Sequence, residues 1–250
     1  MRMRKRHNLV PRMEKCAELV IQDNNAQRGK WRSAFPGYDA LLLELGCGKG
    51  RFTADTAAAT PSALLIALEK VPDAMIVAME RIRDRELKNV RFIDGDAAAL
   101  RDMFAPGEVD RLYINFCDPW PKSRDAKLRL TAPGFLRIYA DILPVGGEIH
   151  FKTDNIPLFD WSVERFTEEG WALSELTHDL HENGPVGVMT DYEAKFYAEG
   201  MKINRLVATK LATTRDGKAG VPPRLRNASL CDARGFEESQ NEKNFAEDEK

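Results

Sequence analysis

The 250-residue sequence predicts an α/β fold with a doubly wound, mostly parallel seven-stranded sheet and helices on both faces. Two observations support this. Apolar runs alternate with helix-like segments from about residue 40 to 180, and runs such as 63–68 are apolar continuously rather than at every second position. Such runs are typical of strands that are buried on both faces of a parallel sheet. Ligands of these sheets bind at the carboxyl ends of the strands, so functional residues are expected there.

Each expected element follows from hydrophobic pattern and punctuation. Pro72 suits the first turn of a helix, and Gly146-Gly147 suits a helix stop. The strands are expected at 41–45, 63–68, 90–93, 111–116, 148–152, 171–178 and 203–209. The helices are expected at 50–59, 72–87, 97–103, 133–143, 156–169 and 191–199.

Charge divides the chain into three parts. Residues 1–38 carry nine Lys and Arg against three Asp and Glu, which predicts a basic N-terminal arm and helix. Residues 39–210 form the predicted α/β domain. Residues 211–250 are polar, with little periodicity, and we expect a mostly disordered tail. A basic arm suits a polyanion such as RNA, although a solvated flexible end is the alternative interpretation.

Bulk composition excludes several classes of protein. No apolar run approaches the roughly 18–20 residues that a membrane span needs, and no secretory signal follows the charged N-terminus. The cysteines lie far apart and form no Cys-x-x-Cys pair, so neither a disulfide framework nor a metal site is expected. They are Cys16, Cys47, Cys117 and Cys231. We therefore expect a cytoplasmic protein, either monomer or homodimer.

A glycine-rich loop follows the first strand in Glu44-Leu45-Gly46-Cys47-Gly48-Lys49-Gly50. Glycines there let the backbone turn sharply and approach a ligand. The Gly-x-Gly-x-Gly spacing differs from the dinucleotide fingerprint, and the Gly-Lys-Ser/Thr of a phosphate loop is lacking because Arg51 follows Gly50. An acid beside the loop favours a cationic ligand. S-adenosylmethionine, with its sulfonium and ammonium groups, fits.

Two further acids end the next two strands. Glu69 can accept hydrogen bonds from ribose hydroxyls, and Asp96 can accept from the exocyclic amine of adenine. Asp96 also suits the N-cap of the helix expected at 97–103, which is the competing interpretation. Together with Glu44, these acids predict a cofactor site along three strand ends.

The fourth strand leads into the most specific stretch of the chain, Asn115-Phe116-Cys117-Asp118-Pro119-Trp120-Pro121-Lys122. It offers a carboxylate, an aromatic plane and a cation, followed by Arg124, Lys127 and Arg129. Such a combination suits a nucleotide, because Asp accepts from a base edge, Trp stacks, and Lys and Arg meet phosphates. The alternative is a rigid turn with a buried Trp.

These motifs resemble the bacterial tRNA (guanine-N7-)-methyltransferase family. The resemblance rests on residues 118–122 together with 44–50, and it covers roughly residues 1–210. Thr153-Asp154, the segment Thr190-Asp191-Tyr192-Glu193-Ala194-Lys195-Phe196 and the basic start Arg2-Met3-Arg4-Lys5 agree with it. Ala67-Leu68-Glu69 departs from the family's frequent Gly-x-Glu. Asp125 and Leu128 interrupt its basic run.

The resemblance implies a class I S-adenosylmethionine-dependent methyltransferase that forms N7-methylguanosine in the variable loop of tRNA. It implies Asp118 as the catalytic residue, without a metal. It places the cofactor at Glu44, Gly46, Gly48, Glu69, Asp96 and Asp118. It places the substrate at Lys122, Asp154, Thr190, Asp191, Tyr192 and Glu193. Thr190 and Glu193 also match a capping box that opens the helix expected at 191–199.

Guanine N7 has a lone pair and no proton, so we expect alignment and electrostatics to dominate catalysis. Asp118 is then expected to orient the base or stabilise charge. Asp154 and Glu193 are expected to accept from the guanine N1–H and amine. Phosphates are expected to meet the N-terminal arm and residues 122–129. Three alternatives remain: methylation of a small molecule or protein, a dinucleotide-dependent oxidoreductase, and an RNA-binding protein without activity.

Overall fold

The computed structural model describes residues 8–213 and 219–220. A seven-stranded sheet has the order β3-β2-β1-β4-β5-β7-β6, and only β7 runs antiparallel to its neighbours. The strands are β1 (Ala40–Leu45), β2 (Ala63–Glu69), β3 (Val90–Asp94), β4 (Arg111–Asn115), β5 (Glu148–Thr153), β6 (Ala172–Thr177) and β7 (Asn204–Thr209). All seven expected strands are present, and the predicted fold class is confirmed.

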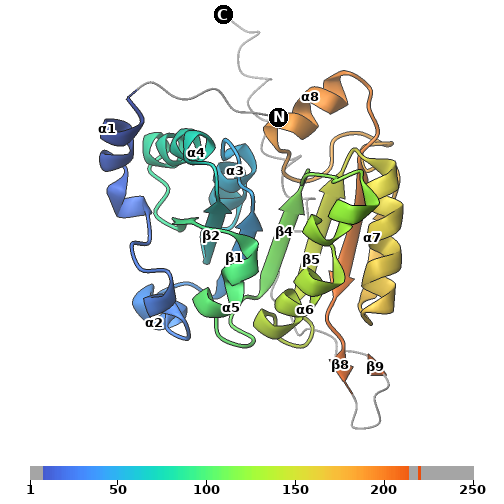
Figure 1. The fold of residues 1–250 in the computed structure, drawn as a ribbon. Helices are drawn as coiled ribbons and strands as arrows, with labels where there is room; N and C mark the ends of the chain where they lie inside the picture. Colours follow the sequence, from blue (N-terminus) through green and yellow to red (C-terminus); the bar gives the residue numbers. More distant parts are fainter. Residues whose placement is uncertain (1–7, 214–218, 221–250) are drawn as a thin grey trace, which may run out of the picture.

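Helices cover both faces of the sheet (Figure 1). The α-helices are α1 (Leu9–Glu14), α2 (Trp31–Ala34), α3 (Arg51–Ala59), α4 (Pro72–Asp84), α5 (Leu100–Met103), α6 (Pro133–Ile142), α7 (Ile156–Glu168) and α8 (Asp191–Ala198). The 3-10 turns are η1 (Ala17–Leu19), η2 (Asn25–Gln27), η3 (Ala97–Ala99) and η4 (Ser123–Leu128). The helix expected at 72–87 ends at Asp84, and the one expected at 97–103 begins as a 3-10 turn.

Strand residues alternate between two apolar cores. In β1, Leu41, Leu43 and Leu45 pack with α5, α6 and α7, whereas Leu42 packs with α3 and α4 on the opposite face. Each of these leucines is at most 2% exposed. This two-sided burial explains why β1 is apolar at every position except Glu44. Burying such a side chain contributes about 1.5–3 kcal/mol, so both helical layers stabilise the sheet.

The described part of the N-terminal segment packs closely on the domain. Cys16 and Trp31 are fully buried, and Val20 pairs with Phe92 at the β3 edge. The Trp31 ring stacks on Phe104 with centroids 5.3 Å apart. From residue 8 onward this segment is therefore part of the fold rather than a solvated end. The basic start Arg2-Met3-Arg4-Lys5 lies outside the described residues.

The expected tail lies mostly outside the described residues. Two short strands, β8 (Ala212–Thr213) and β9 (Ala219–Gly220), pair in antiparallel fashion just after the domain. This ladder is local order that the polar composition did not predict.

The carboxyl ends of β1, β2, β4 and β5 meet at one edge of the sheet because these strands are parallel. Figure 1 shows α8 lying across this edge, above β4 and β5. No helix within the described residues is long and apolar enough to cross a membrane. The edge beneath α8 is where the predicted site residues gather.

Candidate active site

The loop between β1 and α3 is built on three glycines with positive φ. Gly46, Gly48 and Gly50 have φ of 75°, 56° and 75°, a region that other residues adopt only with strain. A Cβ on Gly50 would lie 2.5 Å from the Cβ of Ala78, so this glycine lets α3 and α4 approach. A Cβ on Gly46 or Gly48 would meet nothing within 4 Å. Those two glycines leave open space against the backbone, as a bound cofactor requires.

Glu44 lies beneath this loop and is 2% exposed. The Thr53 hydroxyl donates to its Oε2 over 2.6 Å. Burial raises the pKa of Glu44 to about 7, although the Thr53 hydrogen bond opposes the rise. A cation that binds beside a buried carboxyl of this kind stabilises its ionised form.

Glu69, at the end of β2, organises the loop through three backbone donors. Its Oε2 accepts from the N–H of Gly48 at 2.9 Å, and its Oε1 accepts from Lys70 and Val71, both at 3.0 Å. A carboxylate has about four acceptor positions, so roughly one remains for a ligand hydroxyl. The sequence expected Glu69 to bind ribose, and the structure adds that it fixes the glycine loop.

Asp96 caps η3, since its Oδ1 accepts from the Ala98 N–H at 2.9 Å. The carboxylate is exposed and lies 3.8 Å from Lys70 Nζ. The capping interpretation of Asp96 is thus what the structure shows. Its exposed position near the end of β3 still leaves its second oxygen accessible to a ligand.

A cavity of about 240 Å³ opens at the carboxyl ends of β4 and β5, beneath α8. Asp118, Asp154 and Tyr192 from the predicted site line it together. The remaining lining residues are Phe116, Cys117, Pro119, Thr153, Asn155 and Phe196. The cavity thus combines two carboxylates with aromatic walls.

The loop that carries Asp118 contains two unusual backbone conformations. Phe116 and Trp120 have φ of 53° and 42°, in the left-handed region that bulky residues rarely adopt. Each such conformation costs about 1–3 kcal/mol and persists only where surrounding contacts impose it. These residues bracket Asp118, so the loop is held in one shape at the mouth of the cavity.

Glu193 sits in a buried network rather than in the cavity. It is 0% exposed, and its Oε2 accepts from Lys152 Nζ at 2.6 Å while Oε1 lies 3.1 Å from His181 Nε2. Burial alone would raise the pKa of Glu193, but the His181 hydrogen bond and the Lys152 charge outweigh it and lower the pKa. Burial lowers the pKa of Lys152 despite the opposing effect of Glu193.

The same network forms the capping box expected from the sequence. The Thr190 hydroxyl accepts from the Glu193 N–H at 2.9 Å, and Glu193 accepts from the Thr190 N–H at 3.2 Å. Lys152 also donates to the Val188 carbonyl at 2.9 Å. Asp191 pairs with Arg81 of α4 at 3.2 Å. The start of α8 is therefore tied to both β5 and α4.

Basic side chains follow the cavity along η4. Lys122, Arg124 and Lys127 are exposed, whereas Arg129 is half-buried and directed toward the Asp118 loop. Part of the N-terminal basic charge is already paired, since Arg12 contacts Glu80 and Arg32 contacts Asp110. Exposed cations therefore follow the Asp118 loop directly in the chain, at the start of η4 and along it.

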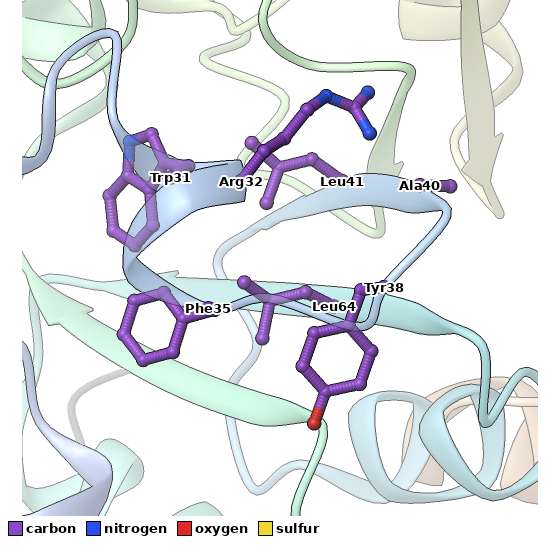
Figure 2. Close-up of a pocket in the computed structure, with 7 residues that line it drawn as sticks. All are labelled: Trp31, Arg32, Phe35, Tyr38, Ala40, Leu41 and Leu64. Atoms are coloured by element: carbon purple, nitrogen blue, oxygen red, sulfur yellow. The ribbon is translucent and has the colours of Figure 1, made fainter.

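A second hollow lies at the opposite end of the sheet and carries no such chemistry. Figure 2 shows it between Trp31, Phe35, Tyr38 and the starts of β1 and β2. Its volume of about 10 Å³ is near the minimum for one water molecule. It is a packing defect of the core rather than a ligand site.

Several residues of the site were not assigned roles from the sequence. Phe196 lies four residues after Tyr192 on α8, and this spacing puts both rings on one helix face. Phe116 was visible only as the end of a strand. Lys152 and His181 gave no signal, because the buried carboxylate of Glu193 that joins them lies on a different element from either side chain.

Comparison with known proteins agrees with this geometry. Residues 39–206 match the model of the Methyltransf_4 family, described as "Putative methyltransferase". The 16S rRNA methyltransferase KamB is similar in structure, with 19% identity, a TM-score of 0.56, and coverage of 73% of this chain and 92% of that chain. A 16S rRNA (adenine(1408)-N(1))-methyltransferase mutant from Catenulisporales acidiphilia has 14% identity, a TM-score of 0.52, and coverage of 77% and 93%. At these identities the neighbours establish a shared fold, that of class I S-adenosylmethionine-dependent methyltransferases.

Proposed function

The chain belongs to the Methyltransf_4 family of methyltransferases, and from that premise we propose that it methylates N7 of guanine in tRNA, with S-adenosylmethionine as donor. The observation that carries the proposal is the cavity in which Asp118 and Asp154 lie among aromatic side chains, after β4 and β5. The glycine loop follows β1, the strand that pairs with β4. The resemblance of residues 44–50 and 118–122 to tRNA (guanine-N7-)-methyltransferases supports guanine N7 as the methylated atom.

The cavity has the chemistry to hold a guanine. Phe116, Tyr192 and Phe196 offer ring faces on which a base can stack. Asp154 can accept from the N1–H and exocyclic amine, the donors on the edge of guanine remote from N7. Holding that edge leaves N7 directed away from Asp154, where a methyl donor can reach it.

The cofactor would be held by the glycine loop with Glu44, Glu69 and Asp96. When bound, S-adenosylmethionine supplies an activated methyl group. The open space at Gly46 and Gly48 and the buried carboxyl of Glu44 fit a ligand that carries sulfonium and ammonium charges.

The transfer needs no proton abstraction. The N7 lone pair forms the new N–C bond as the S–C bond breaks, and the positive charge passes to the guanine ring. Asp118 is exposed at the cavity mouth and is assigned to orienting the base and stabilising that charge. Burial raises the pKa of the neighbouring Cys117 to about 12, so its thiol stays protonated and is a poor nucleophile.

Glu193 is assigned to positioning rather than to direct contact with guanosine. Both of its oxygens are engaged with Lys152, His181 and the Thr190 N–H. Thr190, Asp191 and Tyr192 present the start of α8 to the substrate. Lys122, Arg124 and Lys127 are assigned to phosphates of the RNA.

A labelling experiment tests the proposal. Purified protein is incubated with methyl-labelled S-adenosylmethionine and unmodified tRNA, with 16S rRNA in a parallel reaction. Label is expected in tRNA at N7-methylguanosine, which reductive cleavage reveals because its cationic ring is labile. Asp118→Asn is expected to lower kcat by about 10²–10³-fold, as for loss of a preorganised charge. Label at adenine, or in rRNA alone, would contradict the assignment.

A further inference from the structure

We propose that Arg129 is a positioning residue, which holds the Asp118 loop in its strained shape and does not bind RNA phosphate. Its guanidinium donates through Nε to the Pro119 carbonyl at 3.0 Å and through Nη2 to the Trp120 carbonyl at 3.0 Å. A third contact joins Nε to the Trp120 carbonyl at 3.3 Å. One edge of the planar fork therefore grips two successive carbonyls, directly after Asp118.

The guanidinium is fixed on its other side by α7. Its carbon lies 4.4 Å from the centroid of the Trp161 ring, within the range of a cation–π contact. Arg165 contacts the same ring at 5.7 Å. Arg129 thus links the Asp118 loop to a helix in the core layer, and a lysine could not reproduce this combination of fork and stacking plane.

The Asp118 loop depends on a contact of this kind to hold its backbone conformation. Within the described residues, no hydrogen bond or ion pair holds the Asp118 carboxylate itself, so its place is set by the backbone. That backbone passes through left-handed conformations at Phe116 and Trp120. Trp120 is one of these two strained residues, and its own carbonyl accepts from both Nε and Nη2 of Arg129.

The sequence grouped Arg129 with the phosphate-binding cations of residues 122–129, and the structure separates them. Lys127 is exposed, whereas Arg129 is half-buried with its Nε and Nη2 donors directed at protein carbonyls. Two cations only two residues apart are thereby given different tasks. The kinetic test of this inference rests on the proposed function, because it measures methylation of tRNA. The structural test, which follows the conformation of the Asp118 loop, is independent of that function.

The test compares Arg129→Lys with two controls in the full chain. Arg165→Lys replaces the other guanidinium that contacts Trp161, and Lys127→Ala removes an exposed cation from η4. Arg129→Lys is expected to lower kcat about 10- to 100-fold, because small misplacements of a reacting group are costly. The KM for tRNA and its salt dependence are expected to change less than twofold. Lys127→Ala is expected to do the reverse: the slope of log affinity against log salt falls by about 0.7–0.9. Arg165→Lys is expected to change neither.

A second readout needs no RNA. The Trp120 indole N–H resonance, assigned with Trp120→Phe, is expected to shift or broaden in Arg129→Lys and to stay in place in Arg165→Lys. Affinity for S-adenosylmethionine, measured by calorimetry, confirms that each variant is folded. An unmoved Trp120 resonance, or a loss of salt dependence equal to that of Lys127→Ala, would overturn the proposal. If tRNA is not the substrate, the resonance still reports on Arg129, so the two failures are distinguishable.

Discussion

The carboxylates of Glu69 and Glu193 are both at the ligand edge of the sheet, but they are held in opposite ways. Within the described residues, Glu69 accepts only from the backbone N–H groups of residues 48, 70 and 71, which belong to the unit formed by β1, α3, β2 and the turn after β2. Glu193 depends on the side chains of Lys152 in β5 and of His181 in the loop before α8. The first arrangement uses backbone donors of one strand–loop–helix–strand unit, whereas the second uses side chains from two other elements.

The comparison separates the proposed cofactor half of the site from the proposed substrate half. On the cofactor side, glycine conformations and backbone donors preorganise the site. On the substrate side, the Asp118 loop and the start of α8 are positioned by side chains from other elements, Arg129 and Lys152. Substitutions on the substrate side are therefore expected to act at a distance, and those on the cofactor side locally.

The largest expected effect comes from breaking the buried pair. Lys152→Met leaves the buried Glu193 carboxylate without its cationic partner, with only His181 and the Thr190 N–H beside it, which costs about 3–5 kcal/mol of unfolding free energy. Denaturant unfolding measures it. Lys152→Met combined with Glu193→Gln is expected to restore much of the loss. The control is Lys195→Met, which breaks an exposed pair with Glu199 on α8 and costs at most about 1 kcal/mol. If Lys152→Met lowered the free energy of unfolding by less than Lys195→Met does, the contact between Lys152 and Glu193 would not stabilise the fold.

A smaller effect is expected at the cofactor loop. Gly50→Ala adds a Cβ 2.5 Å from that of Ala78 at positive φ, and it should destabilise the protein by about 2–3 kcal/mol. Gly170 is a matched control, since its φ is also positive, 79°, but its Cβ would meet nothing within 4 Å. Gly170→Ala should cost about 1–2 kcal/mol. Equal losses in thermal unfolding would show that close approach of α3 and α4 is not what the loop requires.

The smallest effect concerns pH. The folded pKa of Glu44 is raised to about 7 from an ordinary 4.5, so the folded state holds an extra proton between these values. Stability from this group is present below pH 4.5 and falls as pH rises toward 7. Binding of a cationic cofactor favours the ionised form, so affinity for S-adenosylmethionine should rise about tenfold from pH 6 to 8.

Calorimetric titration of the wild type and of Glu44→Gln checks this. Because the ammonium of the ligand titrates identically with both proteins, the difference between their pH profiles belongs to Glu44. Parallel profiles would contradict a cationic ligand beside this carboxyl.

Much of the cofactor half was predictable from the sequence. Its signals are local: an apolar run, glycines that tolerate positive φ, and an acid at each strand end. The position of β2 followed from a similarly local pattern, since its continuous apolar run from Ala63 to Leu68 is satisfied by burial on both faces of the sheet. The role of Asp96 as a cap was also visible, because capping depends on residues two or three positions away.

The sequence by itself thus determined the fold, the glycine loop and the identity of the acids around it. Only the tertiary structure decided which of the remaining charges face a ligand and which face the protein. The sequence grouped Glu193 and Arg129 with the substrate contacts, and both turn inward because the folded chain brings Lys152 to Glu193 and Trp161 to Arg129. Partners so far apart in sequence leave no local pattern. A buried charge then pairs within the protein, whereas an exposed charge of the same kind can meet a ligand.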